Sequence, residues 1–248
     1  MVVYSIINQK GGTGKTTTAI NLGAALNRRA KNVLLIDLDA QGNLSYSLGI
    51  NDFDQSMADA LLGECTINDI LQERESLTVA PSDNQLADTE LSLARSEGQE
   101  KALANLVKSL SGFDYILIDC PPSLSMLTIN ALLASDRVII PMQMEVLSLQ
   151  GLDQIVQTIE KVKKTFSKKI TIDGVLPVMV DKRRKLSQEV KEYIQNNYDL
   201  RIFDSLIRSN VKASEAPSFG KSVINYKPTS NSAVDYMRFA DEVLELNR

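Results

Sequence analysis

The residues that suggest chemistry lie near the N-terminus, where three glycines and two lysines fall within residues 10–15. The stretch from Lys10 to Thr17 reads KGGTGKTT and lies between an apolar run and an amphipathic run. Glycines let backbone N–H groups turn toward an anion, a following helix adds its positive N-terminal end, and Lys15 adds a full charge for β- and γ-phosphates. Thr16 is placed to bind Mg²⁺. The pattern predicts a phosphate-binding loop.

Two common glycine patterns do not fit this stretch. The pattern G-x-x-x-x-G-K-[ST] requires a glycine where the chain has Gln9, and a second lysine, Lys10, opens the loop instead. The dinucleotide pattern G-x-G-x-x-G could begin at Gly12 and Gly14, but it needs a glycine where the chain has Thr17. We therefore expect a mononucleotide and not NAD.

Two further apolar runs end in carboxylates. Asp37 and Asp39 follow the run that starts at Val33, and a spacing of two places both on one side of the emerging chain. Asp119 ends the second run and is followed by Cys120 and two prolines. Acids aimed at a phosphate site suggest a metal ion and a water molecule, and Asp119 has the Walker B position for Mg²⁺. The alternative is that each acid simply ends its strand.

These residues need a scaffold, and apolar runs typical of buried parallel strands alternate with helical patterns along the chain. The expected strands are Val2–Asn8, Val33–Asp37, Leu77–Ala80, Tyr115–Asp119, Val138–Met142, Ile172–Val180 and Ile202–Leu206. The expected helices are Ala19–Arg29, Lys101–Leu110, Met126–Leu133, Leu149–Phe166, Gln188–Asn197 and Ala233–Leu246. Short helices within Asn51–Ser111 are expected but not placed. The class is α/β, a mainly parallel twisted sheet with helices on both faces, and ligands bind such sheets at the carboxyl ends of the strands.

Length and composition fit one globular domain. A chain of 248 residues, 44% of them hydrophobic, can bury a full core, so we expect a single domain over residues 1–248. Cys65 and Cys120 lack the spacing of a metal site, and the absence of histidine removes Ser-His-Asp chemistry. No run of about eighteen apolar residues occurs and Val2 already begins a strand, so we expect a cytoplasmic protein.

Several motifs resemble those of the ParA/MinD family of ATPases, most closely its chromosomal and small plasmid ParA (Soj-like) branch. KGGTGKTT with two lysines resembles the deviant Walker A motif, residues 37–43 resemble the D-x-D-x-Q-G-N segment, and residues 119–122 resemble D-[CT]-P-P. Residues 207–221 resemble the family's IPRNVRLSEAPSFGK loop, which is expected to border the adenine. There Ser209 replaces an arginine and the pattern's proline is missing.

The resemblance implies a P-loop NTPase fold and an ATP-sandwiched homodimer, in which Lys10 of each subunit reaches the phosphates bound by the other. It also implies that Asp39 orients the attacking water, that Asp37 helps to organise the magnesium shell, and that Glu145 contacts nucleotide or partner. The expected catalytic residues are Lys10, Lys15 and Asp39. The expected ATP-binding residues are Lys10, Gly11, Gly12, Thr13, Gly14, Lys15, Thr16, Thr17, Gln41 and Glu145. The expected Mg²⁺ residues are Thr16, Asp37 and Asp119.

Charge is distributed unevenly along the chain. Residues 161–227 contain 15 Lys and Arg against 7 Asp and Glu, a net charge of +8 in a chain of net charge −4. A segregated basic face can bind DNA through its phosphates. The lysines between 161 and 169 are typical of a solvated helix end. The expected DNA-binding residues are Arg183, Arg184, Arg208, Lys212, Lys221 and Lys227. Since the core begins at residue 2 and leaves no room for a helix-turn-helix before it, we expect non-specific binding.

The family resemblance implies an ATP-dependent partition or positioning ATPase. Its hydrolysis is expected to be slow until a ParB-like protein or another cargo adaptor stimulates it, and the protein is expected on the nucleoid. One alternative is a ParA-type ATPase that positions a protein organelle. Another is a MinD-like membrane-associated ATPase, although the segment Ala233–Leu246 has more acidic than basic residues. An iron–sulfur reductase of the nitrogenase-iron-protein type would need paired cysteines, which Cys65 and Cys120 do not match.

Overall fold

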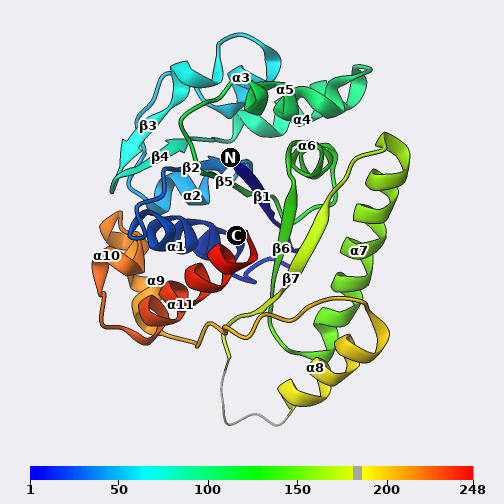
Figure 1. Cartoon of the computed structure of the whole chain (residues 1–248). Coiled ribbons are helices and arrows are strands. Elements are labelled where there is room, and N and C mark those ends of the chain that lie inside the picture. Colours follow the sequence, from blue (N-terminus) through cyan, green and yellow to red (C-terminus); the bar gives the residue numbers. More distant parts are fainter. Residues whose placement is uncertain (181–185, 248) are drawn as a thin grey trace.

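The computed structural model describes residues 1–180 and 186–247, which contain one seven-stranded sheet (Figure 1). The strand order is β3-β4-β2-β5-β1-β6-β7, and neighbouring strands are parallel except β3 and β4. The strands are β1 Val2–Ile6, β2 Val33–Asp37, β3 Gln72–Arg74, β4 Leu77–Ala80, β5 Tyr115–Asp119, β6 Arg137–Met142 and β7 Thr171–Pro177. The predicted α/β class with a mainly parallel sheet is confirmed.

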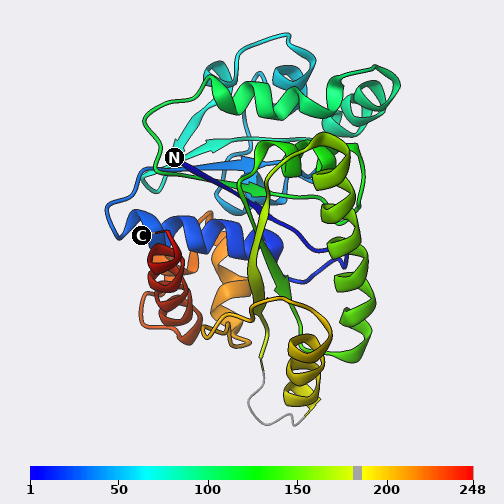
Figure 2. The same ribbon diagram turned by 45° about the vertical axis from the view of Figure 1, so that its right-hand side comes forward.

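Helices cover both faces of this sheet (Figures 1 and 2). One core lies under α1, α2, α9, α10 and α11, and the other lies under α3 to α8. The α-helices are α1 Lys15–Asn27, α2 Asn43–Ser47, α3 Met57–Leu62, α4 Gln85–Arg95, α5 Ala102–Lys108, α6 Met126–Ala134, α7 Val146–Phe166, α8 Leu186–Asn197, α9 Val211–Glu215, α10 Val223–Tyr226 and α11 Asn231–Leu246. The 3-10 helices are η1 Ile67–Ile70, η2 Gln99–Lys101 and η3 Ala216–Phe219.

The central strands are buried on both faces because their apolar side chains alternate between the two cores. In β2, Val33 and Leu35 face the core under α1, whereas Leu34 and Ile36 face the core under α3 to α8. Every residue of β2 and of β5 is buried. A continuous apolar run therefore folds here as a central strand.

The register of the parallel strands brings the candidate acids together. Asp37 at the end of β2 pairs with Asp119 at the end of β5, and Asp119 pairs on its other side with Ile6 of β1. The glycine loop leaves β1 at the same edge, because it connects β1 to α1. The sheet thus positions both carboxylates beside the loop.

The predicted strand Ile202–Leu206 is wrong. Ile202 forms only an isolated bridge with Val175, although Phe203 still donates its backbone N–H to Val175. The carboxylate of Glu242 accepts the backbone N–H groups of Asp204 and Ser205 at 2.9 Å each. Glu242 takes the Ser205 N–H that would face β7, and Pro177 has no N–H to donate, so the ladder is interrupted until the Ile207 N–H donates to the Pro177 oxygen at 2.8 Å.

Other boundaries moved for local reasons. β7 ends at Pro177 and not at Val180, since Met179 has a left-handed φ of 53° that breaks the extended conformation. α1 begins at Lys15, four residues before the predicted start, because Gly14 is its left-handed N-cap. The unplaced helices within residues 51–111 prove to be α3, η1, α4 and η2, and the short edge strand β3 was missed.

Candidate functional site

The glycine loop forms an open cradle between β1 and α1. Gly12 and Gly14 have φ values of 72° and 76°, which favour glycine. A Cβ atom added at Gly11 or Gly12 would meet no heavy atom within 4 Å, so the loop backbone faces open space. No side chain of the described residues caps the N-terminus of α1, whose first N–H groups remain available to an anion. The predicted phosphate geometry is present.

Hydrogen bonds fix the loop to the sheet. The Asn8 side chain donates to the backbone oxygen of Pro141 at 2.6 Å and accepts the Lys10 backbone N–H at 2.9 Å. The Thr13 hydroxyl donates to the backbone oxygen of Lys10 at 3.1 Å. The cradle is therefore preorganised by β6 and by its own residues. Asn8 was not identified from the sequence as a site residue.

Lys15 is buried at the base of the cradle. Its side chain leaves the residue only 7% exposed, and Nζ lies 3.4 Å from the backbone oxygen of Lys10. Burial lowers the pKa of this ammonium, and the negative charge of Asp119 opposes that change. The buried Lys15 ammonium has only one long hydrogen bond, to a neutral carbonyl oxygen, among the described residues. Such a group is suited to binding a negatively charged ligand.

Asp119 has a buried carboxyl group that is suited to binding a cation. It is 1% exposed, and neither carboxylate oxygen has a hydrogen-bond partner among the described residues. Burial raises its pKa well above the usual range, and the charge of Asp37 raises it further. The Thr16 hydroxyl lies near enough to lower the pKa without satisfying either oxygen. These oxygens fit a Mg²⁺ ion.

Asp37 differs from Asp119 because its oxygens are occupied. Oδ2 accepts the backbone N–H of Ser45 at 2.9 Å and its hydroxyl at 2.8 Å, and Oδ1 accepts the Asp39 N–H at 3.3 Å. Complete burial raises the pKa of Asp37 to about 6, and the bonds from Ser45 limit that rise. Ser45 is a further residue of the site. Its only sequence signal is a hydroxyl placed early in a helix that follows the acids.

Asp39 is half-buried and accepts the Gln41 N–H at 3.0 Å. The described residues contain no group of three His, Cys, Asp or Glu side chains that could hold a metal ion on their own. This fits Mg²⁺, which proteins usually bind through one or two carboxylates together with substrate phosphates and water. The described acids therefore do not form a complete cation site on their own.

The second loop lysine is engaged within its own subunit. Lys10 Nζ lies 3.6 Å from Glu145 Oε2 and 3.4 Å from Gln143 Oε1. Glu145 is the N-cap residue of α7, and Gln143 also donates to the sulfur of Met179 at 2.8 Å. Lys10 and Glu145, which the sequence suggested separately as contacts to nucleotide or partner, thus lie together in one subunit, and Gln143 is an additional contact that the sequence did not reveal.

The remaining nucleotide candidates lie on α1 and the segment that faces it. Thr17 is half-buried and lines a small cavity of about 20 Å³ together with Ala213, Pro217 and Lys221. Part of the loop over residues 207–221 therefore packs against the first turns of α1. Gln41 lies instead at a separate pocket beyond Asp39.

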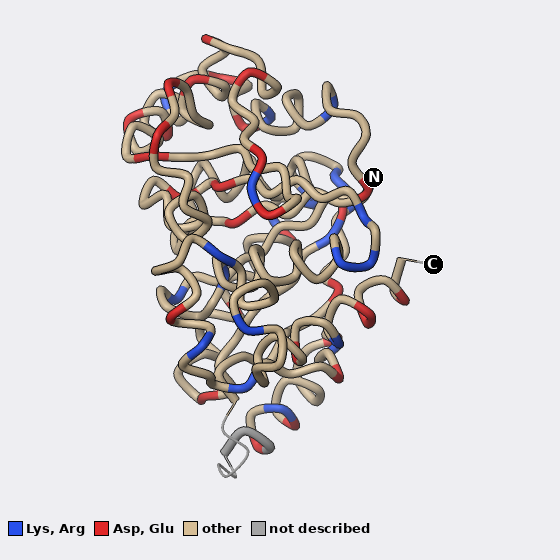
Figure 3. Tube along the Cα trace, turned by 90° about the vertical axis from the view of Figure 1, so that its left-hand side faces the viewer, with Lys and Arg blue, Asp and Glu red and all other residues tan. Residues whose placement is uncertain are grey.

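The basic candidates are not equivalent. Arg208 forms an ion pair with the buried Asp235 at 2.6 Å, and Lys212 forms one with Glu215 at 2.6 Å. Lys221 and Lys227 are exposed. Arg183 and Arg184 lie outside the described residues. Figure 3 shows Lys and Arg mostly through the middle and lower parts of the molecule, while Asp and Glu predominate in its upper part.

In the described part of the chain, no helix is both long and apolar enough to cross a membrane.

A family model described as an AAA domain matches residues 1–172. The chain is 43% identical to the sporulation initiation inhibitor protein Soj of Bacillus subtilis, over 97% of both chains. It is 40% identical to the chromosome partitioning protein ParA of Caulobacter vibrioides, over 99% of this chain and 95% of that one.

Among solved structures, a protein of Mycobacterium smegmatis described as cobyrinic acid a,c-diamide synthase superposes with a TM-score of 0.87 at 35% identity. The match covers 98% of this chain and 94% of that chain, which was crystallised with an ATP analogue and magnesium. A chain of the same fold and similar sequence therefore binds the two ligands that the cradle and Asp119 suit.

Proposed function

The chain belongs to the ParA/MinD family of P-loop ATPases, in the branch of the Soj and ParA proteins, and from this membership we propose that it is a partition or positioning ATPase. It hydrolyses ATP to ADP and phosphate with Mg²⁺, as one domain over residues 1–248. The observation that carries the proposal is the pair of buried, unpartnered oxygens of Asp119 beside Lys15 and the glycine cradle.

Each residue of the site has a role in binding ATP. The backbone N–H groups of the glycine loop and the Lys15 ammonium bind the phosphates. Thr16 and Asp119 hold Mg²⁺, and Asp37 supports the ion's shell from its fixed position. The bound ion supplies positive charge that neutralises the charge developing on the phosphate oxygens.

Asp39 orients the water that attacks the γ-phosphate in line. Its position two residues beyond the fixed Asp37 and its bond to the Gln41 N–H hold the carboxylate at the edge of the site. Hydrolysis is slow in the isolated chain, because phosphoryl transfer depends on positioning and charge stabilisation that a partner protein completes.

Two subunits close over two ATP molecules, and Lys10 crosses to the phosphates of the other subunit. The exposed pair with Glu145 restrains Lys10 weakly, since a long ion pair between exposed side chains adds little stability. Lys10 can therefore leave Glu145 and Gln143 when a more negative triphosphate is presented to it. This exchange links ATP binding to dimer formation.

The closed dimer binds DNA without sequence preference and holds the protein on the nucleoid, within the cytoplasm. Exposed Lys221 and Lys227 are better placed for phosphates than Arg208 and Lys212, whose charges are already paired. A ParB-like protein or another cargo adaptor stimulates hydrolysis, after which the dimer separates and leaves the DNA. The cargo is a plasmid, a chromosome or a protein organelle.

A MinD-like membrane role is disfavoured by the way α11 packs. Its apolar residues Tyr236, Phe239 and Val243 are buried in the core that also contains α1. Arg29, in the turn after α1, forms a bidentate ion pair with Asp241 of α11 at 2.7 Å, which holds the polar side of the helix. An interfacial helix would need a free apolar face with basic residues beside it.

The test combines three measurements on the full chain. The first measures binding of a fluorescent ATP analogue with and without Mg²⁺. The second measures the mass of the protein by light scattering with a non-hydrolysable analogue. The third measures retention of a random-sequence DNA duplex by fluorescence anisotropy. We expect Mg²⁺-dependent binding, a doubling of mass and DNA retention only with the analogue. Lys15→Ala should abolish all three, whereas Lys108→Ala at an exposed position of α5 should change none. A chain that binds the analogue but stays monomeric contradicts the dimer.

A further inference from the structure

The edge strand β3 is joined to β4 by a tight hairpin (Figure 1). Arg74 at the end of β3 pairs with Leu77 at the start of β4, so the turn consists of Glu75 and Ser76 alone. Their φ values are 55° and 63°, in the left-handed region where two-residue hairpin turns favour asparagine and glycine. Other residue types keep this conformation only when the surrounding structure holds them in it.

The turn contacts two distant parts of the chain. Glu75 Oε2 accepts the backbone N–H of Ser222 at 2.9 Å. The backbone oxygen of Ser76 accepts a side-chain N–H of Asn27, the last residue of α1, at 2.9 Å. Ser222 is the N-cap residue of α10 and directly follows the loop over residues 207–221. A hydrogen bond from a backbone N–H to a carboxylate is charge-assisted and therefore strong, so the hairpin holds the end of that loop.

A second contact joins the hairpin to the end of α2. Arg74 Nε donates to the backbone oxygen of Leu48 at 2.8 Å. Gly49 and Gly220 have φ values of 71° and 62°, and a Cβ atom added at Gly220 would lie 3.2 Å from Gly49 Cα. A Cβ atom added at Gly49 would lie 3.2 Å from a guanidinium nitrogen of Arg74. The ends of α2 and η3 therefore meet backbone to backbone beside the Arg74 guanidinium.

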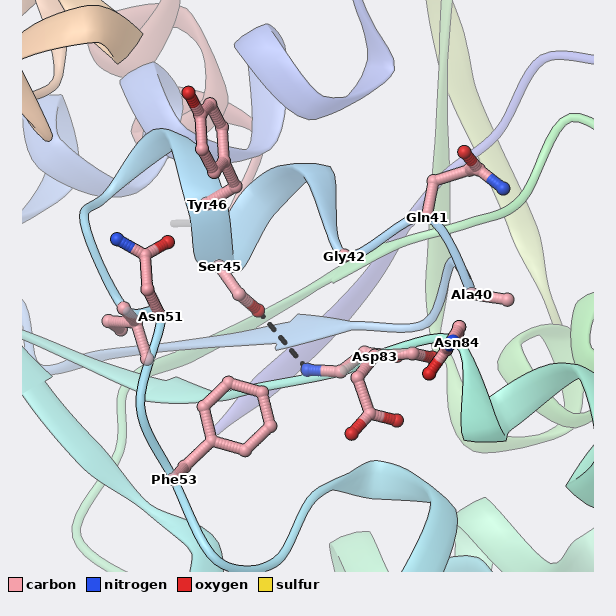
Figure 4. Close-up of a pocket in the computed structure, with 11 residues that line it drawn as sticks. Ala40, Gln41, Gly42, Ser45, Tyr46, Asn51, Phe53, Asp83 and Asn84 are labelled. Carbon is pink, nitrogen blue, oxygen red and sulfur yellow. Dashed lines mark hydrogen bonds between the residues drawn. The ribbon is translucent and has the colours of Figure 1, made fainter.

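The helix α2 is a firm support for this contact. At its start Gly42 has a φ of 59°, and a Cβ atom there would lie 2.7 Å from the backbone oxygen of Ser82, in the segment that follows β4. The Ser45 hydroxyl accepts the Ser82 N–H at 3.1 Å (Figure 4) and donates to Asp37 at 2.8 Å. Both ends of α2 are thus fixed, and the hairpin holds Gly220 against one of them.

The held segment is also bonded to the first turns of α1. Val223 donates its backbone N–H to Asn21 Oδ1 at 2.7 Å. The Asn21 amide is 4% exposed and donates to the backbone oxygen of Thr17 at 2.7 Å. Hydrogen bonds therefore run from Glu75 to Ser222, and from the next residue along the chain through Asn21 to Thr17. Thr17 lies directly after the residues that form the phosphate cradle.

We propose that Glu75 and Arg74 are positioning residues, which hold residues 216–222 against α1 in the conformation that receives the nucleoside part of ATP. The inference rests on the proposed function, in which ATP fills the cradle, and it adds two residues of a distant hairpin to base recognition. Without the bond to Ser222 the segment leaves this conformation for part of the time. Apparent affinity then falls with the fraction of molecules that keep it.

The test measures binding of ADP and of UDP with Mg²⁺ by isothermal titration calorimetry of the full chain. The two ligands share ribose and diphosphate, differ only in the base and are not hydrolysed. The parent should bind ADP more tightly than UDP. Glu75→Ala should lower the affinity for ADP by about threefold to tenfold, the effect of one hydrogen bond, and change that for UDP much less. An equal loss for both ligands would place the effect on the cradle and overturn the inference.

The hairpin itself supplies the matched control. Glu73 Oε1 accepts the Thr78 hydroxyl at 2.7 Å, so Glu73→Ala also removes an acid and a hydrogen bond from this hairpin. It should leave ADP affinity unchanged. Glu75→Gln keeps an acceptor oxygen and should restore most of the affinity, whereas Arg74→Ala should lower it. If Glu73→Ala weakens ADP binding as much as Glu75→Ala, only the stability of the hairpin matters and the inference is wrong.

Hydrogen exchange without nucleotide gives an independent measurement. The peptide over residues 216–223 should exchange faster in Glu75→Ala than in the parent or in Glu73→Ala, and unchanged exchange would overturn the inference. A parent that binds neither diphosphate would defeat the proposed function and the inference together. A parent that binds ADP and UDP equally well would defeat the inference alone, because no segment would then discriminate the base.

Discussion

The hydroxyl of Ser45 lies 2.8 Å from Oδ2 of Asp37, and the backbone N–H of Ser45 donates to the same oxygen at 2.9 Å. Both bonds come from one turn of α2, and they hold a carboxylate that is completely buried at the end of β2. A short helix therefore fixes an acid of the proposed metal site.

Ser45→Ala should lower the free energy of unfolding by about 1 to 2 kcal/mol, because a hydrogen bond to a buried carboxylate is lost. It should also raise the Mg²⁺ concentration needed for ATP binding, since Asp37 is less firmly placed. Chemical denaturation and a Mg²⁺ titration with fluorescent ATP measure the two effects. Ser45→Thr keeps the hydroxyl and should restore both. An unchanged Mg²⁺ requirement would limit Ser45 to a structural role.

Asp119→Asn should stabilise the nucleotide-free protein by about 1 to 3 kcal/mol at pH values where the parent carboxyl is ionised, because the neutral amide avoids the cost of charging a buried group whose oxygens have no hydrogen-bond partner among the described residues. The same variant should lose Mg²⁺-dependent ATP binding. Thermal unfolding without ligand gives the first effect, and fluorescent ATP binding gives the second. Asp114→Asn, just before the other end of β5, is the control. A variant less stable than the parent would mean that Asp119 is satisfied.

Stability of the nucleotide-free protein should rise as the pH falls from 7.5 to 5.5. Burial raises the folded-state pKa of Asp37 to about 6 and that of Asp119 well above its usual value, so the protonated forms are favoured in the folded state. Their contribution is present below the unfolded pKa and is lost as the pH rises through the folded pKa. Urea unfolding at several pH values measures it. Asp119→Asn should flatten the profile, and an unaltered slope would argue against this assignment.

Lys10→Ala should retain ATP binding and lose the doubling of mass that a non-hydrolysable analogue induces. The side chain is exposed and its ion pair with Glu145 is long, so thermal stability should not change. Light scattering measures the mass, and Lys108→Ala, at an exposed lysine of α5, is the matched surface control. If Lys10→Ala still forms dimers normally, Lys10 does not contribute to the dimer interface.

Arg208→Ala should destabilise the fold by about 1 to 3 kcal/mol, because it leaves the buried carboxylate of Asp235 without its partner. Lys221→Ala should leave stability unchanged and weaken DNA retention, with a shallower dependence on salt. Denaturation and DNA anisotropy at several salt concentrations separate the two roles. If Arg208→Ala alters only the salt dependence, Arg208 contacts DNA and the ion pair is incidental.

The central strands and the phosphate loop were predictable because their signals are local. β2, β4 and β5 have the predicted bounds, since a continuous apolar run between turns has few other ways to be buried on two faces. The register then followed from parallel pairing, which brings Asp37 opposite Asp119. Sequence and topology therefore sufficed for the core of the candidate site.

What the sequence did not reveal depends on distant partners. The strand expected at Ile202–Leu206 is prevented by Glu242, which comes from a helix near the C-terminus. The sequence alone suggests that Arg208 is a free cation, whereas in the fold it forms an ion pair with Asp235. Ser45 and Gln143 have ordinary neighbours in sequence, and only the folded arrangement places them against Asp37 and Lys10.

The close approach of Gly42 to the backbone of Ser82 has a consequence for the history of this chain. Any larger amino acid at position 42 would collide with a peptide group that no side-chain rotation can remove. Change at this position is therefore possible only if the path of the second segment is rebuilt at the same time. A graft that brings a larger residue to position 42 must therefore also exchange the segment around Ser82, whereas a graft that keeps Gly42 need not.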